Sequence, residues 1–126
     1  MRDHMARALG AATVLYSAAI MIRPRWLAGP CGLAETDGSV STGTAVLVRA
    51  IGARDTALGA AIVFAPTPVA RRTALWCRAA ADLSDAVLFG AAQQDPARRA
   101  KIAAVAGGWA ALNAAAAQSL TGRPHS

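Results

Sequence analysis

Four long apolar stretches, each followed by a proline-containing segment, organise the sequence. The stretches are Met5–Ile22, Thr44–Ala65, Val69–Ala92 and Lys101–Leu120. They stop at RPRW, PTP, QQDP and TGRP respectively. Proline ends helices because it lacks an N–H group and disfavours helical geometry in the residue before it. Helices of roughly 18 to 24 residues match the ~30 Å hydrocarbon core of a bilayer, so the pattern predicts four helices of membrane-spanning length.

The connections between these stretches differ in length. The loop after the second stretch is very short, so the second and third helices are expected to pack as an antiparallel hairpin. The segment Arg23–Thr42 is rich in glycine, and it also contains Pro30 and the acidic residues Glu35 and Asp37. It is predicted to be a long irregular loop with a turn around Trp26 and Leu27.

Ionisable residues fall on one side of the predicted third helix. A helix turns 100° per residue, so residues three or four positions apart share a face. The residues that follow this spacing are Arg71, Leu75, Arg78, Asp82, Asp85 and Phe89. The other faces are mostly Ala, Val and Leu, which indicates that this polar stripe turns toward the interior of a bundle.

The second helix has a similar stripe made of Arg49, Gly52, Asp55 and Gly59. Glycines at such positions let a neighbouring backbone approach closely. Arg54 lies off the stripe and is expected to reach another neighbour or a water-filled cavity. The first helix carries a weaker version of the pattern, with small or polar residues at Gly10, Thr13 and Ser17.

Charges inside a membrane are costly, at about 2.5 to 3.5 kcal/mol each at the bilayer centre on insertion scales. The sequence therefore predicts that these charges are paired within one polar cluster. The expected pairs are Arg78 with Asp82, and Arg49 or Arg54 with Asp55 or Asp85. Intramembrane charges commonly mark functional sites, and the alternative is a salt-bridge network that only fixes helix register.

Composition supports the membrane interpretation. Of the 126 residues, 55% are hydrophobic and 16% charged, whereas soluble domains average roughly a quarter charged residues. Alanine supplies much of the apolar content and favours closely packed helices. We expect one domain over residues 1–126, all-α, forming a four-helix transmembrane bundle in the cell membrane with several passes. A soluble alanine-rich bundle is the alternative.

The net charge of +6 comes almost entirely from arginine, with Lys101 the one lysine. These residues form no stripe with aromatic residues, so nucleic acid is not an expected partner. Basic residues beside apolar helices are instead typical of membrane proteins, in which they lie at the level of the lipid headgroups. Cys31 and Cys77 are too few for a disulfide framework or a zinc site, and no metal or cofactor is expected. Arg2 and Arg7 precede the uncharged part of the first stretch, as in a signal peptide, but further apolar helices follow, so a retained helix is expected.

Two segments, RAIGARDTALG and RAAADLSDAVL, resemble a pattern in small bacterial four-helix integral membrane proteins of unknown function. That family combines an Arg-x-x-Gly-x-Arg-Asp motif in its second helix with an arginine and two aspartates in the third. The matching residues here are Arg49, Gly52, Arg54, Asp55, Arg78, Asp82 and Asp85. The resemblance implies a membrane location and a shared polar core, but no reaction.

One functional hypothesis is an acid–base site on a lipophilic small molecule, of isomerase, cyclase or hydrolase type. Two carboxylates in a pocket of low dielectric cannot both ionise cheaply, so Asp82 and Asp85 would share one proton, with Asp55 as an alternative base. The residues expected to hold the substrate are Arg49, Arg54, Arg78, Trp109 and Asn113. In a weaker variant of this hypothesis, Asp55, Asp82 and Asp85 bind Mg²⁺, and the metal binds the diphosphate group of a substrate.

The other hypothesis is a non-catalytic membrane subunit or ligand-binding module whose Arg/Asp network is structural. Its helix contacts are expected at Gly52, Gly59, Gly107 and Gly108. Under either hypothesis the expected partners are membrane lipid and a lipophilic small molecule, with a homo-oligomer left open. A pocket lined by the three aspartates favours chemistry, whereas a packed and mutually paired network favours structure.

Overall fold

The chain forms four long helices and one short helix in the computed structural model, which describes residues 2–120. The helices are α1 (Arg2–Ile22), α2 (Arg25–Ala28), α3 (Thr42–Phe64), α4 (Pro68–Ala92) and α5 (Pro96–Ser119). The described residues contain no strand, so the all-α prediction is confirmed. The turn expected around Trp26 is the short helix α2. The TGRP stop predicted after the last helix lies outside the described residues.

Side-chain caps set where the helices begin. Ser41, Thr67 and Asp95 precede α3, α4 and α5, and the side chain of each accepts a hydrogen bond from a backbone N–H of the first turn. The last helix starts at Pro96, not at Lys101 as the sequence predicted. A proline at the first helical position costs nothing, because the N–H it lacks has no partner there.

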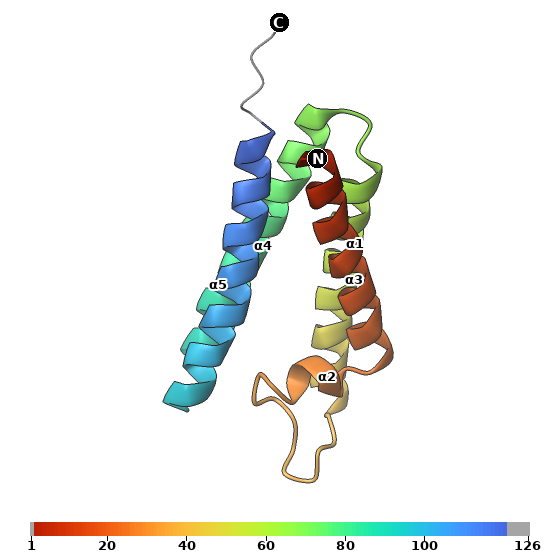
Figure 1. Ribbon diagram of the computed structural model, residues 1–126. Helices are drawn as coiled ribbons and strands as arrows, with labels where there is room; N and C mark the ends of the chain where they lie inside the picture. Colours follow the sequence, from red (N-terminus) through yellow and green to blue (C-terminus); the bar gives the residue numbers. More distant parts are fainter. Residues whose placement is uncertain (1, 121–126) are drawn as a thin grey trace, which may run out of the picture.

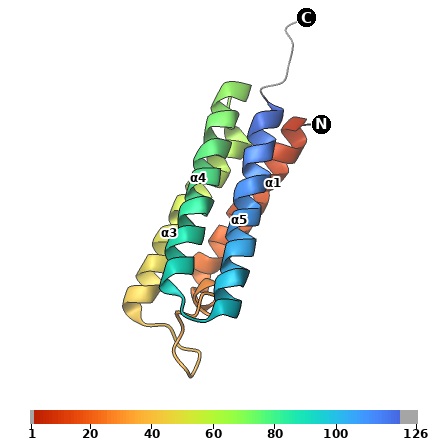
Figure 2. The ribbon, with the colours of Figure 1, turned by 90° about the vertical axis from the view of Figure 1, so that its left-hand side faces the viewer.

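The long helices pack as two pairs, α1 with α3 and α4 with α5. Figure 1 shows the pairs close together at the end that holds the N-terminus and the α3–α4 turn, and diverging toward α2. Figure 2 shows the molecule turned by 90°, and in this view the four long helices run along one common direction. The α3–α4 contact confirms the predicted hairpin, although each of these helices packs more extensively against its other neighbour.

Glycines permit the close approach of α1 and α3. A Cβ atom added at Gly59 would lie 2.8 Å from the carbonyl oxygen of Gly10, and one added at Gly10 would lie 2.9 Å from that of Gly59. A Cβ added at Gly52 would lie 2.9 Å from a backbone oxygen of α1. No close helix contact within the bundle occurs at Gly107 or Gly108, since an added Cβ would meet nothing within 4 Å among the described residues at either position.

Arginines from other segments donate hydrogen bonds to the carbonyls at the C-terminal end of each long helix. The last carbonyls of a helix have no partner within it and carry the negative end of the helix dipole. The pairs are Arg49 Nε to Met21 O (3.1 Å, α1), Arg71 Nε to Ile62 O (2.9 Å, α3), Arg99 Nε to Gly90 O (3.1 Å, α4) and Arg2 Nη1 to Ser119 O (3.1 Å, α5). These four arginines therefore stabilise the C-terminal ends of all four long helices.

We expect Arg71→Gln to destabilise the protein by about 1 to 2 kcal/mol. Arg71 is buried, also donates to Ala65 O at 3.0 Å, and lies 3.4 Å from Asp3. Its loss leaves carbonyls of α3 without donors. Arg72→Gln is the matched control, because Arg72 makes no hydrogen bond or ion pair with residues 2–120. Thermal unfolding that shifts equally in both variants would contradict this role.

Among the described helices, α1 alone is long and apolar enough to cross a membrane by length and composition. A core helix of a soluble protein and a signal sequence share this length and composition. Helices α3 and α4 carry several ionisable residues, and α5 is rich in alanine, which is only weakly hydrophobic. Helix composition therefore does not support several passes, and the multi-pass bundle stays a prediction.

Candidate functional site

The middle of the bundle is polar. Every long helix contributes buried polar or charged side chains there, which we call the polar layer: Thr13, Ser17, Asp55, Arg78, Asp82 and Asn113. Along α1 and α3, this layer lies between two apolar clusters, one containing Ala6 and Ile62 and the other Ile20 and Val48. The arrangement confirms that the predicted stripes face the interior at Gly52, Asp55 and Gly59 on α3 and at Arg71, Leu75, Arg78 and Asp82 on α4.

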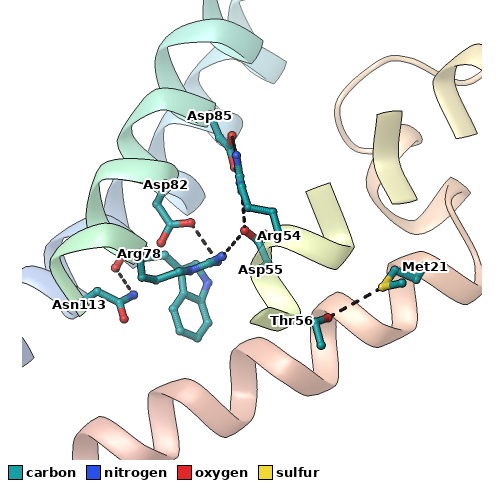
Figure 3. Close-up of polar contacts among 9 residues, drawn as sticks. Met21, Arg54, Asp55, Thr56, Arg78, Asp82, Asp85 and Asn113 are labelled. Carbon is teal, nitrogen blue, oxygen red and sulfur yellow. Dashed lines mark hydrogen bonds and ion pairs between the residues drawn. The ribbon is translucent and has the colours of Figure 1, made fainter. Parts of the chain in front are cut away.

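Arg78 joins α4 to α3 within this layer. Its Nη1 atom lies 2.6 Å from Asp55 Oδ1, and its Nη2 atom lies 2.9 Å from Asp82 Oδ1 (Figure 3). The predicted pair Arg78–Asp82 is confirmed. All three side chains are buried, so their attraction is little screened by solvent.

Arg54 extends the pairing toward the surface. Its Nε lies 3.0 Å from Asp55 Oδ1, and its two Nη atoms bind both oxygens of Asp85, at 3.2 and 2.7 Å. This bidentate geometry is the strongest form of an arginine–carboxylate pair. The Arg54 side chain is 37% exposed and that of Asp85 20% exposed, so this is the outer end of the cluster.

Together these contacts form a row of alternating charges, which we call the ion-pair row: Asp85, Arg54, Asp55, Arg78 and Asp82. Asp55 Oδ1 is shared by both arginines and is the centre of the row. Asp82 and Asp85 occupy its opposite ends, and each has its own guanidinium partner. This geometry does not join the two carboxylates as the proton-sharing pair that the sequence suggested.

Arg49 is not part of the row, contrary to the sequence-based expectation. It is exposed, and its Nε donates to the carbonyl oxygen of Met21. The buried face of α3 runs through Val48, Gly52, Asp55, Gly59 and Ile62. Val48 therefore occupies the inward position of that turn, and Arg49 is rotated by 100° away from it.

The two candidates on α5 differ in burial. Asn113 is fully buried and belongs to the polar layer, whereas Trp109 is only partly buried. The Asn113 amide donates to the backbone oxygen of Trp109 at 2.8 Å, within the same helix. Their role in substrate binding stays a prediction.

Several buried atoms of the polar layer have no hydrogen-bond partner in the described part of the chain. They are Thr13 Oγ1, Ser17 Oγ, Arg78 Nε, Asp82 Oδ2 and Asn113 Oδ1. Buried polar atoms are normally satisfied by protein or by internal water. The layer thus has hydrogen-bonding capacity, contributed by three helices, that its own side chains do not use.

Two cavities lie away from the ion-pair row. One of about 370 Å³ is lined mostly by Arg23, Pro24, Arg25, Arg49 and the loop segment 38–40. Another of about 220 Å³ lies between residues 31–33 and the C-terminal end of α4. Neither is lined by the three aspartates, and the described residues contain no group of three acids, histidines or cysteines arranged to hold a metal ion. The described residues therefore show no ligand set for the Mg²⁺ variant of the hypothesis.

Sequence reasoning missed the contact between Asp55 and Arg78. The signal was present, because these residues lie at similar distances from the turn at 65–67, and equal distances from a tight turn place two residues at the same level of a hairpin. It also missed that Arg23 and Arg25 share a cavity with Arg49.

No family model, curated protein or solved structure matches this chain. The resemblance to small bacterial four-helix membrane proteins therefore stays a prediction. The function has to be argued from the polar layer, the ion-pair row and the surface around them.

Proposed function

We propose that the protein is a non-catalytic, multi-pass membrane protein in which α1, α3, α4 and α5 cross the bilayer and the ion-pair row fastens the two helix pairs together. The observation that carries this proposal is the reversed distribution of polarity. Asp55 is only 4% exposed, whereas Leu15 is 73% and Phe64 81% exposed. Large apolar side chains are exposed on every long helix, including Leu88 on α4 and Leu112 on α5.

Lipid explains this distribution better than water does. Soluble proteins rarely bury charges and rarely expose large apolar patches. In a bilayer, apolar side chains gain nothing by turning inward, while polar groups must find partners inside the bundle. A bundle of four helices that has apolar outer faces and paired charges at its centre is therefore the arrangement expected in a bilayer.

The pairing supports a structural use of the row. Each of its carboxylates has a guanidinium within 3.0 Å, and the Arg54–Asp85 and Arg78–Asp55 contacts both connect α3 to α4. These contacts hold one helix pair against the other where apolar packing in lipid would be weak. A mutually paired network of this kind favours the structural hypothesis over the catalytic one.

The native cysteines provide a test of the membrane proposal. Cys77 is exposed on α4, at ~14 Å from the start of that helix, whereas Cys31 is partly buried in the loop after α2. In a bilayer, a water-soluble maleimide should label Cys31 and spare Cys77, because lipid shields the middle of α4. In a water-soluble bundle the order reverses.

The measurement uses the variants Cys77→Ser and Cys31→Ser in native membrane vesicles, opened so that the reagent reaches both sides. Burial raises the pKa of the Cys31 thiol, so less thiolate is present at neutral pH and labelling should accelerate in alkaline buffer. Labelling in denaturing detergent confirms that both thiols are intact. Rapid labelling of Cys77 in intact vesicles would contradict the proposal.

The acid–base site is a second candidate, favoured by one observation. Asp82 Oδ2 and Asn113 Oδ1 are buried without hydrogen-bond partners among the described residues, so each has an unused capacity to accept a hydrogen bond from a polar group. Native mass spectrometry of the purified protein tests it. A co-purifying lipophilic molecule that Asp82→Asn retains but no longer converts would support catalysis. If no such molecule is found and the protein stays folded, the structural function is favoured.

A further inference from the structure

Three arginines meet at one cavity at the α2 end of the bundle. The cavity has a volume of about 370 Å³, and its lining comes from the segment after α1, from helix α2, from the loop segment 38–40 and from the first turns of α3. Figure 1 shows α2 beside the start of α3 at this end of the bundle. Arg23 follows α1, Arg25 begins α2 and Arg49 lies on α3. The lining contains no acidic side chain.

The charges of these arginines are not neutralised by the protein. None of the three forms an ion pair with residues 2–120, in contrast to Arg54, Arg71 and Arg78. The acid closest in sequence to the lining, Asp37, accepts hydrogen bonds from the N–H and hydroxyl of Ser39, at 2.9 and 2.6 Å. Those bonds hold the pKa of Asp37 below its usual value and keep its carboxylate within its own loop.

Two of the guanidinium groups are positioned in advance. Arg49 Nε is fixed by the carbonyl oxygen of Met21, which leaves its Nη atoms available. The guanidinium of Arg23 lies over the ring of Trp26, 5.8 Å from its centre. Groups already held in place lose less conformational entropy when they bind a ligand.

We propose that Arg23, Arg25 and Arg49 form a binding site for a phosphate group. The planar guanidinium offers paired donors that match phosphate oxygens, and three such groups around one cavity suit a singly or doubly charged phosphate. The phosphate comes from the headgroup of an anionic phospholipid or from free phosphate. The first source rests on the proposed membrane location, in which this end of α1 lies at headgroup level.

Lipid binding to the full-length protein tests the site. The protein is placed in nanodiscs of phosphatidylcholine with or without phosphatidylglycerol, and retained lipid is counted by native mass spectrometry. Arg23→Gln and Arg25→Gln should each weaken phosphatidylglycerol binding about tenfold, because each removes charge-assisted hydrogen bonds. Arg49→Lys should weaken it less, since the charge remains but the paired donors do not.

Arg7→Gln is the matched control, because it removes one exposed positive charge at the opposite end of α1. Arg25 makes no hydrogen bond or ion pair through its side chain with the described residues, so its variant reports on binding even if Arg23→Gln unfolds. Inorganic phosphate is added as a competitor. Arginine-dependent binding that phosphate displaces identifies free phosphate as a ligand, and binding that resists phosphate identifies the lipid headgroup.

Two results would overturn the site. One is that Arg23→Gln and Arg25→Gln bind phosphatidylglycerol and inorganic phosphate as the unmodified protein does. The other is that Arg7→Gln loses as much binding as they do, which would show a general effect of net charge. The labelling of Cys77 tests the membrane proposal, and the arginine variants test the phosphate site. Failure of one proposal can therefore be distinguished from failure of the other.

Discussion

Arg78→Ala is expected to destabilise the protein by about 3 to 5 kcal/mol, more than any other single change considered for this bundle. Arg78 is the only guanidinium in contact with Asp82 among the described residues, and both are buried. Its removal leaves the Asp82 carboxylate buried without a cationic partner. Asp55 is affected less, because it keeps Arg54 at 3.0 Å.

The double change Arg78→Leu with Asp82→Leu should cost clearly less than Arg78→Ala, because it removes both charges together and replaces them with apolar side chains. Asp82→Leu alone should also cost less, since Arg78 keeps Asp55 as a partner at 2.6 Å. Unfolding of the full chain in detergent micelles, followed by circular dichroism, measures all three. Equal losses for Arg78→Ala and the double variant would show that Arg78 and Asp82 do not stabilise each other.

The helices were predictable because the signals for them are local. Long apolar stretches and the prolines that follow them mark where each helix lies, and the predicted ends agree with the structure within a few residues for α1, α3 and α4. The start of α5 was misplaced at Lys101, because proline was interpreted only as a breaker. Asp95 accepts a hydrogen bond from the N–H of Ala97 and makes Pro96 a helix start.

The site was predictable only in part, for a geometric reason. A pair within one helix, such as Arg78–Asp82, follows from its spacing alone. Contacts between helices also depend on which faces meet, which the spacing within one helix does not specify. Arg49 and Val48 are both compatible with a stripe of three- and four-residue steps, and the packing of α1 on α3 decides between them. The long side chain of Arg54 reaches Asp85 from a position off the stripe.

Gly59→Ala is expected to destabilise the protein by about 2 to 3 kcal/mol, although it adds a single methyl group. The new Cβ would lie 2.8 Å from the backbone oxygen of Gly10, and also 2.8 Å from a methyl group of Val14. A backbone oxygen in the middle of a helix cannot rotate away as a flexible side chain can. Helices α1 and α3 would have to separate, which loosens the contact that makes them a pair.

Gly107→Ala is the matched control for this change, because it adds the same methyl group to a helix at a position with nothing within 4 Å. Alanine is the better helix former by up to about 1 kcal/mol, so this variant should be as stable as the unmodified protein or more so. Thermal unfolding of both variants under one condition separates the effect of contact from that of helix propensity. If Gly59→Ala unfolds at the same temperature as Gly107→Ala, the Gly10–Gly59 contact does not determine how closely α1 and α3 pack.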